Sequence, residues 1–116
     1  MSQPMRPSDS LPPHEQQAVA VYFEGDAEFY RMFRASAVQQ FPVDLQEGEA
    51  AIQAGDAQAL RRAAHTLKGV LLTLGHAELS AFAKTVEQAT QQAPWDEAVA
   101  GWRELRARLL AAFGLA

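Results

Sequence analysis

Residues 60–75, LRRAAHTLKGVLLTLG, form the stretch from which the fold of the chain can be read. Alanine, leucine and arginine dominate it, and neither glycine nor proline interrupts it before Gly69, so the composition predicts a helix. At about 3.6 residues per turn, one side of that helix gathers apolar side chains. These predict a core-facing stripe that consists of Leu60, Ala63, Ala64, Leu67, Leu71 and Leu74.

The other side of this helix carries polar residues and a glycine, each three or four positions from a neighbour: Arg61, His65, Lys68, Gly69 and Leu72. It combines a titratable nucleophile, a cation one turn later and a residue without a side chain. Glycine inside a helix costs roughly 0.5–1 kcal/mol relative to alanine. We therefore interpret Gly69 as open space that lets another molecule approach His65; a close crossing of two helices is the alternative.

AHTLKG, followed by a helical apolar run and Leu74-Gly75, resembles the phosphoacceptor motif of histidine phosphotransfer (HPt) domains of two-component phosphorelays. The specific part is His, Leu, Lys and Gly at these spacings, with a further glycine six residues later. The resemblance covers about residues 26–92, because it extends upstream to Gly55-Asp56 and downstream to Leu79, Phe82 and Val86-Glu87. Val70 departs from the pattern, since the family often has a small residue there.

The resemblance implies that His65 is the phosphoacceptor and that Lys68 neutralises charge on the phosphoryl group. A neutral imidazole has a lone pair at ordinary pH, so histidine suits the role of nucleophile. In the family, the phosphoryl group is exchanged with an aspartate of a response-regulator receiver domain. That domain supplies Mg²⁺ and most catalytic groups, so we expect no cofactor on this chain.

Four further residues are predicted to form the docking surface for such a partner: Gly69, Leu72, Arg61 and Arg62. The arginines could steer an acidic receiver pocket, and Leu72 could belong to an apolar docking patch. An ordinary solvated surface is the alternative for all three side chains.

Composition excludes several other classes of protein. A length of 116 residues with 48% apolar residues indicates one domain with a real core. The chain has no cysteine, and His14 and His76 lack a partner pattern, so we predict no metal site. A net charge of −4 argues against nucleic-acid binding. Without a membrane-spanning apolar run or a signal peptide, we expect a cytoplasmic monomer.

Proline, glycine and helical periodicity divide the chain into a flexible leader over residues 1–13 and a helical domain over 14–116. Helices are expected at 14–23, 26–40, 42–54, 56–75, 77–91 and 94–113, with a break or kink at Pro42. Gly25-Asp26 and Gly55-Asp56 each combine a helix stop with an N-cap. Short links favour antiparallel neighbours. We therefore predict an all-α fold: an antiparallel four-helix bundle with an additional short N-terminal helix.

The same periodicity predicts the buried sides of the first three helices. For 14–23 these residues are Val19, Tyr22 and Phe23; for 26–40 they are Phe29, Met32, Phe33, Ser36 and Ala37, closed by Phe41. For 42–54 they are Val43, Leu45 and Ile52, joined by Ala51 and by Gly48, for which a close helix crossing is a possible reason.

The predicted function is that of a histidine-containing phosphotransfer protein that relays a phosphoryl group between aspartates of receiver domains. A hybrid sensor histidine kinase is a further expected partner. The chain has no glycine-rich phosphate-binding loop and no room for an ATP-binding domain, so it should act as a relay without kinase activity of its own. Two alternatives stay open: an HPt-like module that docks on a receiver or kinase without transfer, and a structural bundle in which HTLKG is accidental. A stand-alone protein and an excised module of a hybrid kinase are both compatible with the sequence.

Overall fold

The computed structural model describes residues 10–115, in which five α-helices and no strand are found. They are α1 (Pro13–Tyr22), α2 (Ala27–Ala54), α3 (Ala57–Thr73), α4 (Ala77–Gln92) and α5 (Trp95–Ala112). The all-α prediction is confirmed. Most of the expected leader lies outside the described residues, although its last residue, Pro13, begins α1. None of the described helices is both long and apolar enough to cross a bilayer.

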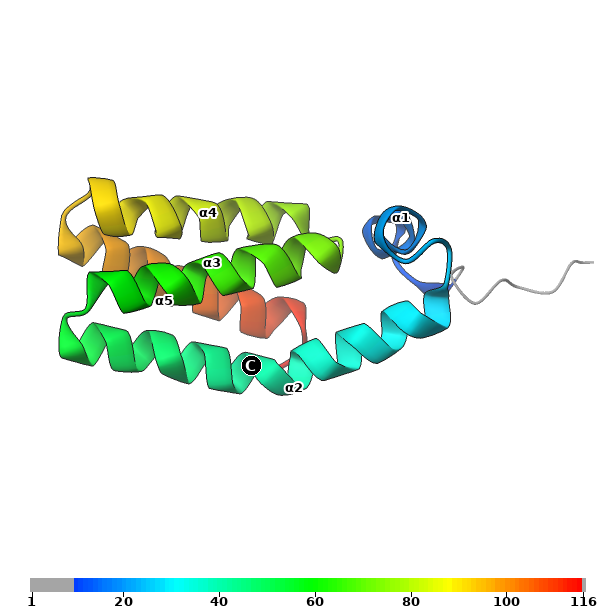
Figure 1. Cartoon of the computed structure of the whole chain (residues 1–116), viewed down its shortest axis with the longest axis horizontal. Helices are drawn as coiled ribbons and strands as arrows, with labels where there is room; N and C mark the ends of the chain where they lie inside the picture. The colour runs from blue at the N-terminus through cyan, green and yellow to red at the C-terminus, as the bar shows by residue number, and fades with distance from the viewer. Residues whose placement is uncertain (1–9, 116) are drawn as a thin grey trace, which may run out of the picture.

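The C-terminal half of α2 and the helices α3, α4 and α5 lie side by side as a bundle (Figure 1). The links between them cover only residues 55–56, 74–76 and 93–94, so successive helices run antiparallel. Helix α3 packs against α2 on one side and α4 on the other, while α5 packs on α4 and also contacts α2. The predicted four-helix bundle is confirmed, and α1 is the predicted additional helix at its end.

Both stop-and-cap signals act as predicted. Gly25 and Gly55 have φ values of 82° and 64°, in the left-handed region that ends a helix readily at glycine. Asp26 Oδ1 then accepts a hydrogen bond from the Phe29 N–H at 2.9 Å, and Asp56 Oδ1 accepts one from the Ala59 N–H at 3.0 Å. The second cap fixes the start of α3, the helix that carries His65.

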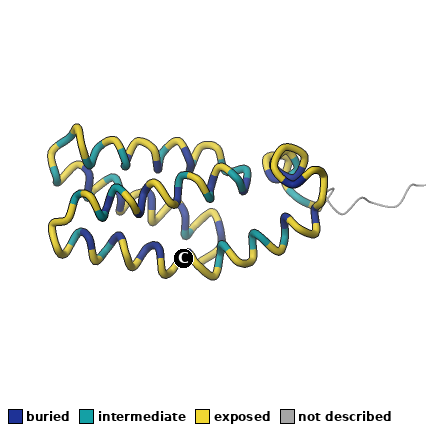
Figure 2. Tube along the Cα trace, viewed as in Figure 1, coloured by how far each residue is buried: buried dark blue, intermediate teal, exposed yellow. Residues whose placement is uncertain are grey.

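The core stripe predicted from residues 60–75 is confirmed, because all six of its side chains are buried. Figure 2 shows the buried positions recurring along the inward sides of the bundle helices. The crossing of α2 over α5 depends on Gly48: a Cβ there would lie 1.9 Å from Cζ2 of the buried Trp102. A close helix crossing is therefore the reason for this glycine.

Helix α2 is continuous through Pro42, so the expected division into helices at 26–40 and 42–54 is wrong, whereas the kink expected as the other outcome is present (Figure 1). Proline has no N–H for the carbonyl of Val38, and Figure 1 shows that α2 bends in its middle. The helix nevertheless continues because Phe41 and Leu45 are buried on either side of the proline, while Pro42 itself faces solvent.

The predicted buried side of the N-terminal half of α2 is also partly wrong. Phe29 and Met32 are 54% and 65% exposed, whereas Tyr30 is fully buried. This half of α2 extends past the ends of α3 and α4, so few elements cover it (Figure 1). As a result, only a narrow face of this half of α2, which includes Tyr30, is buried. The other predicted core residues that prove to be exposed are Tyr22, Ser36 and Val43.

Tyr30 fastens α1 to the end of the bundle. Its hydroxyl oxygen lies 2.7 Å from Oε1 of Glu15 in α1 and 2.8 Å from the carbonyl oxygen of Leu74. Arg34 Nε also donates to Glu15 Oε1, at 3.1 Å. Burial raises the pKa of Tyr30, and the hydrogen bond to Glu15 raises it further, so the phenol keeps its proton. Helix α1 is thus held beside the link between α3 and α4.

Candidate functional site

His65 projects from the middle of α3, with a side chain that is 66% exposed. Its Nδ1 lies 3.0 Å from Oε1 of Glu87 in α4. A carboxylate oxygen accepts hydrogen bonds, so this contact places the ring proton on Nδ1. Nε2 then keeps its lone pair on the exposed side of the ring. The arrangement presents one nitrogen of His65 as a nucleophile and orients the ring through the other.

Glu87 holds Lys68 as well as His65. The Lys68 Nζ lies 2.8 Å from Glu87 Oε2, and the lysine side chain is only 28% exposed. Lys68 is therefore only partly exposed, because the ion pair draws the side chain toward α4. The hydrogen bond from Lys68 is the main cause that lowers the pKa of Glu87; burial opposes it and the hydrogen bond with His65 assists it. Glu87 is accordingly ionised at neutral pH.

From the sequence, Glu87 was predicted only as part of the family pattern, without a chemical role. The sequence nevertheless contains a signal that Glu87 lies opposite His65. In two antiparallel helices joined by a short link, residues at similar distances from the link lie opposite each other. His65 precedes Gly75 by about as many residues as Glu87 follows it.

Gly69 faces open space, since a Cβ at this position would meet nothing within 4 Å. The alternative of a close helix crossing is excluded here. The backbone around Gly69 is braced: Ser80 Oγ donates to the Lys68 carbonyl at 2.8 Å, and Thr73 Oγ1 donates to the Gly69 carbonyl at 3.0 Å. Val70, the departure from the family pattern, is partly buried and packs against the core. The position one turn from His65 is therefore open, and the backbone there is held by two side-chain hydrogen bonds.

The other predicted docking residues lie on two sides of α3. Leu72 is exposed one turn beyond Gly69 and lines a groove of about 230 Å³ together with Val21 and Tyr22 of α1. Arg62 is exposed but lines a different groove, between α2 and α3. Arg61 is partly buried, and neither arginine forms an ion pair with a residue that the structure describes. His65, Lys68, Gly69 and Leu72 are thus brought together, whereas Arg62 lies apart.

Residues 28–112 of the chain match the family model of the Hpt domain. The chain belongs to the Hpt domain family. Membership implies phosphotransfer in two-component signalling, in which Hpt domains interact with receiver domains and kinases. The matched part of this Hpt protein includes α3, α4 and α5 with His65, Lys68 and Glu87, whereas α1 precedes it. No curated protein and no solved structure matches the chain.

Proposed function

We propose that this Hpt protein relays a phosphoryl group between aspartates of receiver domains through a phosphohistidine at His65. The observation that carries the proposal is the exposed imidazole of His65, oriented by Glu87 beside the open surface at Gly69. The receiver domain would supply Mg²⁺ and the aspartate. Consistent with the proposed partners, we expect the protein to act in the cytoplasm and as a monomer.

Phosphoryl acceptance requires only the imidazole of this chain as a reacting group. The Nε2 lone pair of His65 attacks phosphorus of the receiver's aspartyl phosphate in line, forming the N–P bond as the P–O bond breaks. The aspartate carboxylate leaves with the bonding electrons. Nδ1 keeps its proton throughout, so the ring becomes cationic, and Glu87 stabilises that charge at 3.0 Å. Donation to a second receiver follows the same path in reverse.

Lys68 supports this transfer through its charge. The carboxylate of Glu87 holds the ammonium of Lys68 and the ring of His65 next to each other. A lysine ammonium carries three donors on a flexible stem, so it can rotate from the carboxylate toward phosphoryl oxygens. The Glu87 contact therefore keeps a cation near the phosphoryl group without fixing it in one position.

Lys68→Ala should slow phosphoryl transfer by about tenfold without changing the fold. A charge-assisted hydrogen bond is worth about 1.5–3 kcal/mol, and partial exposure reduces this value. Transfer rates from a phosphorylated receiver, measured by rapid quench, give the effect, and circular dichroism checks the fold. An unchanged rate in a normally folded variant would remove Lys68 from the mechanism.

Gly69→Arg should fold normally yet lose both receiver binding and phosphoryl transfer. Apart from its chain neighbours and the backbone of its own helix, nothing lies within 4 Å of a Cβ at this position, so the side chain has room but would occupy the surface beside His65. Gly69→Ala is the matched control. It should bind nearly normally, and it should be neutral or up to ~1 kcal/mol more stable, since alanine is the better helix former.

Titration of both Gly69 variants with a receiver domain, together with thermal melts, separates docking from stability. A stable Gly69→Arg protein that accepts phosphate at the normal rate would contradict docking on this surface.

The relay itself is tested by phosphotransfer profiling against the receiver domains of the source organism. Each receiver is phosphorylated, separated from its phosphodonor and incubated with the protein. Rapid transfer to the protein from one receiver, and onward from the protein to another, is the expected result. A receiver that binds tightly but transfers nothing in either direction would instead support the non-transferring binding module.

A further inference from the structure

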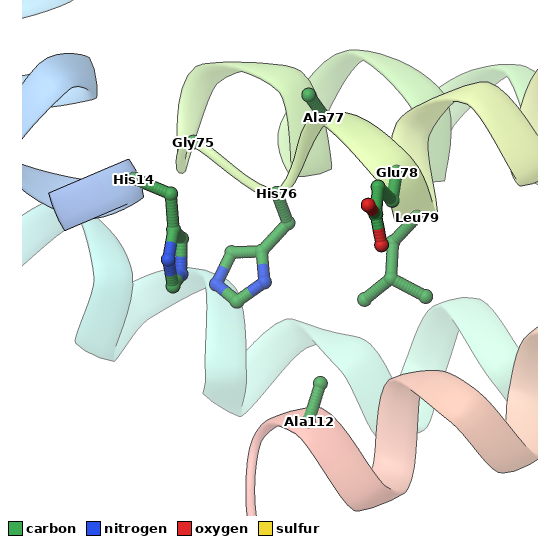
Figure 3. Close-up of a pocket in the computed structure, with 7 residues that line it drawn as sticks. All are labelled: His14, Gly75, His76, Ala77, Glu78, Leu79 and Ala112. Carbon is green, nitrogen blue, oxygen red and sulfur yellow. The ribbon is translucent and has the colours of Figure 1, made fainter. Parts of the chain in front are cut away.

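Three potential metal ligands meet at the end of the bundle opposite the link between α4 and α5. His14 and Glu15 lie in the first turn of α1, and His76 is the N-cap of α4. Their ligand atoms all lie within 4.8 Å of one another. The two imidazole rings stand edge to face (Figure 3). Their centroids lie 4.8 Å apart. Residues far apart in the sequence thus form a group of two imidazoles and one carboxylate.

His76 presents a nitrogen for which the described residues offer no hydrogen-bond partner. Its Nε2 is buried and lies 4.0 Å from Oε1 of Glu15. A buried polar atom without a partner calls for a bound water or ion.

Glu15 is a carboxylate ligand whose orientation is already fixed. Its side chain is buried, and Oε1 receives hydrogen bonds from Tyr30 and Arg34. Such outer contacts are what orient a metal-binding carboxylate. Oε2 receives no hydrogen bond from the residues that the structure describes, so it retains its lone pairs. Because Arg34 offsets part of the carboxylate charge, the two imidazoles would contribute much of the binding.

The two histidines of the group, but not Glu15, line a cavity of about 540 Å³ that has room for a water ligand. Figure 3 shows His14 and His76 at this cavity, with the start of α4 and Ala112 of α5 as further walls. Tetrahedral Zn²⁺ with bonds of about 2.0 Å places its ligands about 3.3 Å apart. The present spacing is wider, since His76 Nε2 lies 4.0 Å from Glu15 Oε1, so metal binding would have to draw the ligand atoms closer together. His14 is the exposed member of the three and therefore the least confined.

We propose that His14, Glu15 and His76 bind one Zn²⁺ ion, with water as the fourth ligand. Two imidazoles, one carboxylate and an open position form a donor set suited to zinc, whereas Mg²⁺ prefers a shell of oxygen atoms. The bound ion would tie α1 to the link between α3 and α4. The site is separate from His65, whose own neighbours are Glu87 and Lys68.

Zinc titration of the chelator-treated full chain tests the site, with isothermal calorimetry and thermal melts as readouts. The expected result is one ion per chain and, at about 100 times Kd, a melting temperature higher by on the order of 10 °C. His14→Ala should abolish both effects while keeping the metal-free melting temperature, because His14 is exposed. His76→Gln should likewise abolish binding.

His65→Gln is the matched control, because it removes the chain's remaining histidine and should leave zinc binding unchanged. Mg²⁺ at the same concentrations should not raise the melting temperature. The proposal is overturned if the wild-type chain shows no saturable zinc binding, if His14→Ala binds as tightly as wild type, or if His65→Gln loses the ion. An equal stabilisation by Mg²⁺ would also overturn it.

Discussion

His65→Gln should abolish phosphoryl acceptance and leave the fold intact. The glutamine amide has no nucleophilic nitrogen lone pair, and none of the other proposed site residues can replace the imidazole as acceptor. Because the His65 side chain is 66% exposed, the free energy of unfolding should change by no more than about 0.5 kcal/mol. Incubation with a phosphorylated receiver, followed by phosphate-affinity electrophoresis, measures the loss.

His14→Gln is the control for this experiment, since His14 is also exposed but lies on α1. It should accept phosphate at the wild-type rate. Label that persists in His65→Gln, or that disappears in His14→Gln, would show that the acceptor has been assigned to the wrong histidine.

Gly48→Ala should destabilise the protein by about 1–3 kcal/mol or more, despite the better helix propensity of alanine. The added Cβ would lie 1.9 Å from Cζ2 and 2.2 Å from Cε2 of Trp102. The indole is fully buried, so moving it out of the way would disturb the core around it. The crossing of α2 and α5 would have to open. Urea unfolding monitored by circular dichroism gives the change in the free energy of unfolding.

Gly69→Ala is the matched comparison, because both glycines lie inside helices and only their surroundings differ. Position 69 is open, so the same substitution should be neutral or slightly stabilising there. Equal effects at the two positions would show that helix propensity outweighs packing, contrary to the expected close contact with Trp102.

The sequence predicts α3 and its neighbours well because their pattern is periodic and their ends are marked. Residues 60–75 form a strongly amphipathic helix, and its six predicted core residues are all buried. Aspartate caps and glycine stops depend only on neighbouring residues, so local reasoning suffices for them. Gly48 was identified as unusual, but only the structure shows that Trp102 is its reason.

Periodicity fails where a helix leaves the bundle. The pattern of apolar residues in the N-terminal half of α2 cannot reveal that few elements cover it, so Phe29 and Met32 were wrongly expected to be buried. A break or kink was expected at Pro42, and the structure has the kink (Figure 1): burial of Phe41 and Leu45 on either side keeps the bent helix continuous. The exposure of Phe29 and Met32 and the continuity of α2 both depend on contacts with residues far away in the sequence, which a local sequence pattern does not reveal.

The partners of the site residues are the part that sequence reasoning could not supply. His65 and Lys68 follow from one motif, but their shared contact with Glu87 depends on how α3 and α4 are aligned. His14 had no partner in the sequence because His76 approaches it only when α1 folds back onto the bundle. Helix α1 also places Val21 and Tyr22 beside Leu72, which enlarges the apolar surface next to the proposed docking site.

Identification of the phosphorylated atom by ¹H–¹⁵N NMR of the imidazole rings is the most direct test of the proposed role of His65. The protein is labelled with ¹⁵N and phosphorylated by its receiver partner, and the spectrum is recorded under conditions that preserve phosphohistidine. Because Glu87 engages Nδ1, the expected result is phosphate on Nε2 of His65 with a proton on Nδ1. Phosphate on Nδ1 of His65, or on His14 or His76, would contradict it.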